Sequence, residues 1–149
     1  MKFNEIKISE SLIIKEVDDD GLAAVFPVIA QLRPHFCLEK YVTLVKEMKT
    51  QGYRAICLYE EGAAVAYAGF VVLQNLYYGR HIWIYDLVTD EARQGRGFGK
   101  ILLSGIERWG KDNRLENVAL QSGFVREGAH RFYESMGYVK PSAVFRKEL

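Results

Sequence analysis

Apolar residues recur along the chain with two different periods, and together they predict a layered α/β fold. Apolar positions three and four residues apart predict four helices, at residues 22–32, 38–49, 97–111 and 128–136. Short runs rich in apolar residues, bounded by turn residues, predict six strands, at residues 12–17, 53–59, 63–73, 82–89, 117–121 and 143–147. The order β, α, α, β, β, β, α, β, α, β combines helices with the strands of one sheet.

Turn residues support several of these boundaries. Pro34 ends the first helix, since proline disfavours the helical conformation of the residue before it. Glu60-Glu61-Gly62 predicts a hairpin between two strands, and Gly137 predicts a left-handed cap after the last helix.

The composition indicates one globular domain, residues 1–149. Hydrophobic residues make up 49% of the chain, and a chain of this length buries roughly 70% of the surface that it exposes when unfolded. Lys and Arg (20) nearly balance Asp and Glu (19), so the charge does not favour binding to nucleic acid or to a membrane. The two cysteines lack C-x-x-C spacing, and the polar start is not a signal peptide. We therefore expect a cytoplasmic protein without a bound metal.

The clearest candidate site is the segment Gln94-Gly95-Arg96-Gly97-Phe98-Gly99-Lys100, between a predicted strand and a predicted amphipathic helix. Three glycines within five residues suit a loop that turns with positive φ or brings its backbone close to a ligand. The helix that follows offers unpaired N–H groups and the positive end of its dipole, and Arg96 and Lys100 add charge. The segment thus predicts a phosphate or pyrophosphate site; a tight turn without a ligand is the alternative.

Two common nucleotide-binding motifs do not fit this segment. The dinucleotide pattern G-x-G-x-x-G, counted from Gly95, requires glycine where Lys100 stands. The P-loop pattern requires glycine in place of Gln94 and Ser or Thr in place of Ile101. An NAD-dependent dehydrogenase and an ATP-dependent kinase are therefore disfavoured.

Two blocks of the sequence resemble the GNAT superfamily of acyl-CoA N-acyltransferases. Gln94-x-x-Gly97-x-Gly99 is similar to its acetyl-CoA motif, Q/R-x-x-G-x-G/A, and residues 129–138 (AHRFYESMGY) are similar to its A-x-x-F/L-Y-x-x-x-G-F/Y block. The resemblance implies a mixed, mostly antiparallel central sheet flanked by helices on both faces. It also implies an acyltransferase that moves an acetyl group from acetyl-CoA directly to a primary amine.

The resemblance assigns most of the expected site. In that family a bulged strand bonds the pantetheine arm of CoA, the glycine loop holds the pyrophosphate, and a tyrosine, here Tyr133, protonates the departing thiolate. Arg126 stands where the family often has asparagine, and we expect it to contact a phosphate or the acceptor. Ordinary packing is the alternative for Tyr133 and the strand residues. The expected CoA-binding residues are Leu87, Val88, Thr89, Gln94, Gly95, Arg96, Gly97, Phe98, Gly99, Lys100 and Arg126.

The acceptor amine must lose a proton before it attacks. Holding a lysine-like amine neutral near pH 7 costs roughly 5 kcal/mol. We expect Asp86, just before the expected bulge, to act as the base; a strand-end carboxylate bonded to backbone is the alternative. By the same resemblance, Arg33 and His35 would contact the acceptor, and His35 as a plain surface residue is the alternative. Weaker candidates for the base are Tyr85, Glu91 and Glu39.

The acceptor class stays open between a small-molecule amine and a protein amino group. Many members of the superfamily form pairs, so the resemblance allows for a homodimer. The main rival function is a non-catalytic acyl-CoA sensor with the same fold, in which the CoA site is kept and the chemistry is lost.

Overall fold

The computed structural model describes residues 1–124 and 126–149, which form two compact units, Met1–Ala119 and Leu120–Leu149. The strands are β1 (Ile6–Lys7), β2 (Leu12–Glu16), β3 (Arg54–Glu60), β4 (Ala63–Asn75), β5 (Gly79–Thr89) and β6 (Asn117–Leu120). The helices are α1 (Leu22–Leu32), α2 (Leu38–Thr50), α3 (Phe98–Asp112) and α4 (Glu127–Ser135). Two short 3-10 turns, Asp19–Gly21 and Glu91–Arg93, precede α1 and the glycine loop.

The six strands form one sheet in sequence order, β1-β2-β3-β4-β5-β6. Each pair from β1·β2 to β4·β5 is antiparallel. The chain returns to the sheet as β6 after passing through α3. The Glu116 N–H donates to the Arg80 carbonyl at 2.8 Å, which brings the beginnings of β5 and β6 together. Since β5 and β6 are neighbours in the sheet and begin side by side, they run parallel, which the crossover through α3 allows. The predicted mixed, mostly antiparallel sheet is confirmed.

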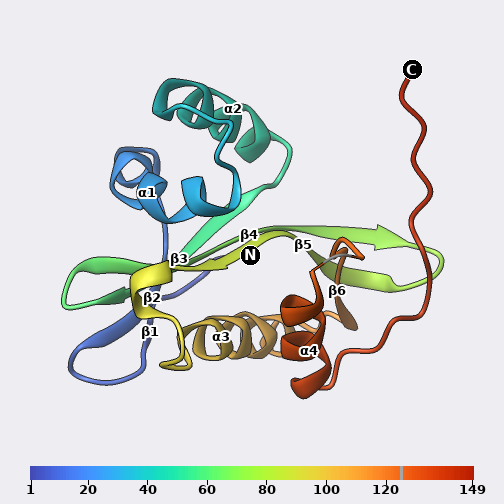
Figure 1. Cartoon of the computed structure of the whole chain (residues 1–149). Helices are drawn as coiled ribbons and strands as arrows, with labels where there is room; N and C mark the ends of the chain where they lie inside the picture. Colours follow the sequence, from blue (N-terminus) through green and yellow to red (C-terminus); the bar gives the residue numbers. More distant parts are fainter. Residues whose placement is uncertain (125) are drawn as a thin grey trace. The chain divides into compact units, whose positions relative to one another are not determined.

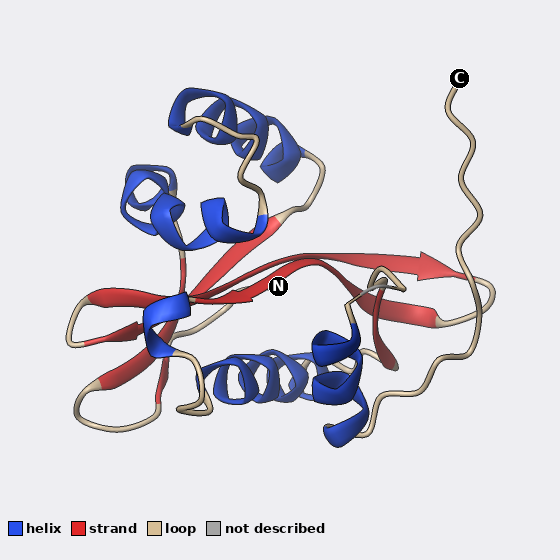
Figure 2. Ribbon diagram, in the orientation of Figure 1, coloured by secondary structure: helices blue, strands red, loops and turns tan. Residues whose placement is uncertain are grey.

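Helices cover both faces of the sheet in the first unit (Figure 1; Figure 2). α1 and α2 lie on one face, where buried Tyr67 and Val71 of β4 belong to their apolar core. α3 lies on the other face and comes close to the strands at two glycines. A Cβ on Gly105 would lie 2.6 Å from Ile14, and one on Gly110 would lie 2.9 Å from Ile82, so these glycines permit the close packing.

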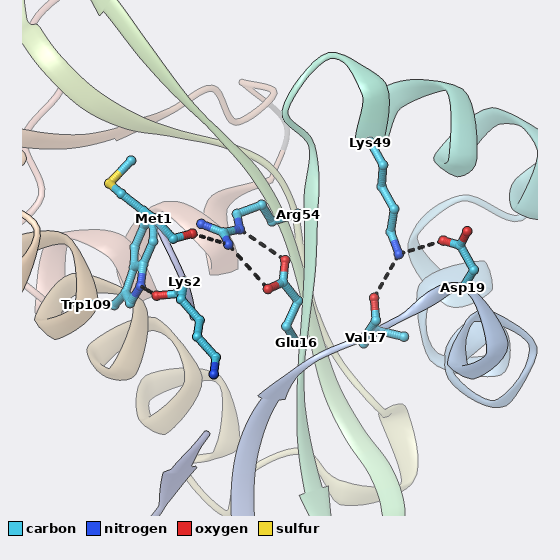
Figure 3. Close-up of polar contacts among 8 residues, drawn as sticks. All are labelled: Met1, Lys2, Glu16, Val17, Asp19, Lys49, Arg54 and Trp109. Atoms are coloured by element: carbon cyan, nitrogen blue, oxygen red, sulfur yellow. Dashed lines mark hydrogen bonds and ion pairs between the residues drawn. The ribbon is translucent and has the colours of Figure 1, made fainter. Parts of the chain in front are cut away.

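Polar contacts join α2 and α3 to segments that flank the strands (Figure 3). The Lys49 ammonium, near the end of α2, donates to the Val17 carbonyl and to Asp19, both at 2.9 Å. This links α2 to the connection between β2 and α1, and the hydrogen bond and charge of Lys49 lower the pKa of Asp19. On the opposite face, the Trp109 indole N–H of α3 donates to the Lys2 carbonyl at 2.9 Å. These contacts hold α2 beside the end of β2 and α3 beside the segment before β1.

Most predicted elements are confirmed to within a few residues. The predicted hairpin is present, with φ of +49° at Glu61 and +83° at Gly62, the left-handed pair that a type I′ turn requires. Gly137 has φ of +88°. Its N–H donates to the Glu134 carbonyl and the Tyr138 N–H donates to the Tyr133 carbonyl, both at 3.0 Å, which is the Schellman pattern of a helix C-terminus.

The predicted strands differ from the observed ones in two places: one strand was missed, and one predicted strand is absent. The sequence pattern missed β1, whose two residues are too short to show a period. The predicted strand at 143–147 is absent: the structure describes all five residues and assigns them neither strand nor helix. Val144 and Phe145 are 58% and 95% exposed, so this segment lacks the buried apolar face that stabilises a strand.

Candidate active site

The glycine loop connects β5 to α3 and has two left-handed residues. Gly95 has φ of +83°, and Gly97, the N-cap of α3, has φ of +79°. A Cβ on either residue would meet nothing within 4 Å, so the backbone there borders open space. Gly97 makes no side-chain capping hydrogen bond. The first amides of α3 therefore fit an anion, because a helix N-terminus carries unpaired N–H groups and partial positive charge.

Side chains hold the loop at both ends. Before the loop, the side-chain amide of Gln31 in α1 makes two hydrogen bonds. Its Nε2 donates to the Asp90 carboxylate at 3.1 Å, and its Oε1 accepts from the Glu91 N–H at 2.9 Å. Within the loop, the Arg96 guanidinium donates to both carboxylate oxygens of Glu60, at 2.7 and 3.1 Å. The loop conformation is thus fixed from α1 and from the end of β3.

The Arg96 side chain, which was expected to add charge beside the ligand, is paired within the chain. Its guanidinium lies 4.6 Å from the ring centre of Phe98 and pairs with Glu60, so its charge is balanced within the chain. Lys100 and Gln94 are exposed, and Phe98 is buried in the core. Among the loop side chains, Lys100 is placed to add charge beside the first turn of α3.

The bulge in β5 lies two residues earlier than predicted. Asp86 pairs with Gly69 of β4 and Ile84 pairs with Phe70, so Tyr85 is the extra residue. Ile84 lies on the face of α3, because its partner Phe70 packs on Trp109 of that helix at 5.5 Å. The bulge reverses the alternation, and Asp86 lies on the face of α1 and α2. Asp86 follows the bulge rather than preceding it.

The predicted pantetheine strand, Leu87 to Thr89, continues β5 after the bulge. These residues are half-buried and pair regularly with residues 66–68 of β4. The expected bulge at these three positions is therefore wrong. Their position between Asp86 and the glycine loop does place them on one strand that connects the two candidate sites.

A pocket of about 190 Å³ lies between α1, α2 and the sheet, and Asp86 lines it. Its wall is mainly apolar and aromatic. The lining residues are Phe26, Ile29, Ala30, Arg33, Phe36, Tyr41, Leu44, Val45, Met48, Tyr53, Tyr85 and Asp86. The arrangement, an apolar hollow with a few convergent polar groups, is typical of small-molecule sites.

Asp86 is held on both sides of its carboxylate. The Arg33 guanidinium contacts Oδ1 through Nε at 3.0 Å and Nη2 at 2.9 Å, and it also donates to the Tyr85 carbonyl. The Tyr53 hydroxyl donates to Oδ2 at 2.9 Å. The side chain of Asp86 is 13% exposed. Its carboxylate is therefore oriented by side-chain partners, which differs from the backbone-bonded alternative considered above.

A chain of buried tyrosines leads to Asp86, and the sequence did not reveal it. The Tyr41 hydroxyl donates to Tyr67 at 3.0 Å, and Tyr67 and Tyr53 share a hydrogen bond of 2.9 Å. Since Tyr53 donates its proton to Asp86, Tyr67 is the donor to Tyr53. Burial raises the pKa of Tyr41 to about 12 and raises those of Tyr53 and Tyr67 well above 10. All three hydroxyls are protonated at neutral pH.

Gly69 makes room for this chain. A Cβ at Gly69 would lie 1.8 Å from the Tyr53 hydroxyl and 2.4 Å from its Cζ, so any larger residue would displace the ring. The Tyr53 ring also stacks on Tyr85, at 6.0 Å and 12°. The bulge and the glycine opposite it thus serve the same end, because both bring Tyr53 to Asp86.

Of the two residues predicted to contact the acceptor, Arg33 lines the pocket and His35 does not. Arg33 and Phe36 line the pocket, whereas His35 is exposed and its ring packs on Phe36 at 4.5 Å. Of the weaker candidates for the base, Tyr85 lines the pocket, and Glu39 and Glu91 are exposed.

The second unit contains Tyr133 and Arg126. Tyr133 is half-buried in α4, with ring contacts to Phe132 and Tyr138. Burial raises its pKa above 10, and the charge of Arg126 opposes this shift. Arg126 is the N-cap of α4, and its carbonyl accepts from the His130 N–H at 3.0 Å.

Comparison with known proteins identifies the family. The model of the acetyltransferase (GNAT) family matches residues 23–138. The chain belongs to this family. It is 35% identical over 124 residues to the uncharacterized N-acetyltransferase YhdJ of Bacillus subtilis (strain 168), covering 82% of this chain and 87% of that protein. The chain is accordingly an acyltransferase, as its sequence predicted.

Solved structures of this fold support the GNAT architecture. The aminoglycoside N-acetyltransferase AAC(6')-Iy in complex with CoA superposes with a TM-score of 0.82 at 14% identity, covering 97% of this chain and 99% of that one. The ribosomal-protein-alanine N-acetyltransferase of Brucella melitensis biovar Abortus 2308 gives 0.81 at 14% identity, covering 93% and 99%. At these identities the likeness concerns the fold.

Two further findings concern metal ions and membranes. Among the described residues, no group of three or more His, Cys, Asp or Glu side chains could hold a metal ion. The longest helix in residues 1–124 and 126–149 is α3, with 15 residues, and none there could span a membrane.

The two sequence blocks that resemble the family pointed to the glycine loop, but they gave no sign of Tyr53, Tyr67 or Gly69. One signal for the bulge was present in the sequence. Ile82 and Ile84 are aliphatic at even positions, and the next aliphatic residue, Leu87, is at an odd one; such a change of phase within a strand indicates an extra residue.

Proposed function

We propose that this GNAT enzyme transfers an acetyl group from acetyl-CoA to a primary amine, with the whole chain acting as one catalytic domain. The observation that carries the proposal is the course of β5. Its bulge turns Asp86 into an apolar pocket, and eight residues later the same segment reaches the glycine loop, whose left-handed backbone fits a pyrophosphate. One strand thus links a site for an amine with a site for the CoA phosphates.

The residues account for the protons of the reaction. An ammonium that enters the pocket gives one proton to the Asp86 carboxylate, and the neutral nitrogen then forms a bond to the acetyl carbon. CoA supplies the thioester whose carbon–sulfur bond breaks. We assign to Tyr133 the proton that the leaving thiolate takes up. The second proton, which the nitrogen loses as the amide forms, replaces it on Tyr133, and Asp86 releases its proton to solvent before the next turnover. Burial keeps the pKa of Tyr133 above 10, so the phenol retains its proton near pH 7 and can donate it.

Calorimetry and a thiol-release assay on the full chain test this proposal. We expect CoA and acetyl-CoA to bind, and free thiol to appear only when acetyl-CoA and an amine are both present. Absence of heat and of competition with CoA at millimolar concentration would remove the proposed CoA site. Binding without turnover on any amine of a broad panel would favour the sensor function.

The proposed acid is tested by Tyr133→Phe. The variant keeps the ring contacts with Phe132 and Tyr138 but lacks the proton, so we expect the kcat to fall about 10²- to 10⁴-fold with the Kd for CoA unchanged. Tyr138→Phe is the matched control, since the family block accepts Phe or Tyr there. Equal losses in both variants would assign the effect to packing.

A further inference from the structure

The pocket at Asp86 has a chemistry that selects among amines. Of its twelve lining residues, two are charged, Arg33 and Asp86, and they are paired with each other. The net charge of the lining is therefore zero. Each ammonium of a polyamine or amino sugar beyond the first would enter an apolar wall with no carboxylate to meet it, and burying such a charge unpaired is costly.

The capacity of Asp86 matches a single amine. A carboxylate offers about four acceptor positions. Among the described residues, Arg33 contacts Oδ1 twice and Tyr53 donates once to Oδ2. One position on Oδ2 is thus left for the N–H of an acceptor. The apolar wall also disfavours the ammonium form and so lowers the pKa of an amine held there.

The size of the pocket limits the group that the acceptor carries beside its amine. An apolar cavity of about 150 Å³ in another protein holds benzene, and this pocket measures about 190 Å³. Phe26, Phe36 and Tyr41 supply aromatic rings to its wall, and Met48 supplies a thioether, which are groups that pack on a flat ring or a branched alkyl chain.

From these observations we propose that the acceptor is a small primary amine bearing one apolar group about the size of a phenyl ring, rather than a polyamine or an amino sugar. The proposal rests on the acetyl transfer proposed above and narrows its substrate. A free arylalkylamine and an apolar amino acid share this chemistry. The amino acid adds a carboxylate beside the amine, where the Arg33 guanidinium lies 2.9 Å from Asp86.

The test compares kcat/KM for 2-phenylethylamine, L-phenylalanine, spermidine and glucosamine with the full chain and saturating acetyl-CoA. We expect one of the two phenyl compounds to exceed both spermidine and glucosamine by at least about 10-fold. The better of the two identifies the source, and a preference for phenylalanine that Arg33→Gln abolishes assigns its carboxylate to Arg33. A higher value for spermidine or glucosamine would overturn the proposal.

A variant that narrows the pocket gives an independent test. Ala30 of α1 lines the pocket, whereas Ala24 of the same helix is exposed. We expect Ala30→Leu to lower the ratio of kcat/KM for 2-phenylethylamine to that for methylamine about 10-fold, and Ala24→Leu to leave the ratio unchanged. An unchanged ratio in Ala30→Leu would contradict the proposal even though acetyl transfer persists. Failure of the wild type to bind CoA would instead reject the proposed function.

Discussion

The two ends of the segment from Asp86 to Gly97 are built in opposite ways. The glycine loop uses backbone: two left-handed glycines beside open space and a helix start without a side-chain cap. The pocket at Asp86 uses side chains that come from α1, α2 and β5, from the connection between α1 and α2, and from Tyr53 just before β3. A site made of backbone depends on a few consecutive residues, whereas a site made of side chains depends on the whole first unit.

This difference indicates where each part of the enzyme can vary. A loop that binds a ligand through its amides is restricted mainly at the residues that need positive φ, here Gly95 and Gly97, and at the side chains that fix its conformation. A pocket assembled from several elements and connections can change one lining residue at a time while Asp86 stays in place. The proposed CoA site is thus the constant part, and the proposed amine site is the part that sets specificity.

The largest effect is expected at the side-chain end. Asp86→Asn keeps the shape and an acceptor for Arg33 but removes the proposed base, so we expect kcat to fall about 10²- to 10⁴-fold while the Kd for CoA is unchanged. Steady-state kinetics and calorimetry give the two values. Glu91→Gln is the control, because it neutralises an exposed carboxylate in the same segment. A comparable loss in Glu91→Gln, which was a weaker candidate for the base, would contradict the assignment of the base to Asp86.

The backbone end is tested by Gly97→Ala. Alanine at φ of +79° costs about 1–2 kcal/mol, and its Cβ enters the space that the amides face. We expect the Kd for CoA to rise about 10- to 100-fold, as the loss of charge-assisted hydrogen bonds predicts. Gly52→Ala is the matched control, since Gly52 has φ of +97° and equally open surroundings. It should lower the Tm similarly and leave the Kd for CoA unchanged.

The tyrosine chain connects the pocket to the core, and two variants separate its roles. Tyr53→Phe removes the donor to Asp86, so we expect kcat to fall about 10-fold. Tyr67→Phe keeps that donor, and its kcat should change less than about 3-fold. Both should lower the free energy of unfolding by about 1–3 kcal/mol, because each leaves a buried hydroxyl without its partner. Equal losses of kcat would mean that the three hydroxyls act as one unit.

The smallest effect concerns the pair that fixes the loop. Glu60→Gln weakens the contact to Arg96, whose side chain is half exposed, and partly exposed pairs contribute about 0.2–1 kcal/mol. We expect the Kd for CoA to rise about 2- to 5-fold in low salt and less in high salt. Glu61→Gln, in the adjacent turn, should have no effect. A drop in the Kd for Glu60→Gln would show that Arg96, once released, binds phosphate itself.

The sequence was sufficient for features that depend on neighbouring residues. The periods of α1 and α3, the Glu61–Gly62 turn and the Gly137 cap are local, and their prediction is confirmed. The glycine loop is local too, and the positive φ expected there is confirmed at Gly95 and Gly97; the anion site stays a prediction. The roles of the individual site residues stay predictions.

Features that depend on contacts between distant elements escaped prediction. The hydrogen bond from Tyr53 to Asp86 spans 33 positions, and that from Tyr41 to Tyr67 spans 26, so no spacing rule connects them. Arg96 was expected to face a phosphate, and its pairing with Glu60 depends on how the β3–β4 hairpin folds. The strand at 143–147 failed because alternation alone does not supply a surface to bury.

The extra residue in β5 has a consequence for how such an enzyme can change over time. Because Tyr85 is the extra residue, loss of its codon would leave Ile84 opposite Phe70 and Asp86 opposite Gly69, so Asp86 would stay on the face of α1 and α2. Only the bulge and the ring that stacks on Tyr53 would be lost. The strand can therefore lose this one residue without moving the proposed base, whereas a deletion in a regular stretch of strand turns every later side chain to the other face.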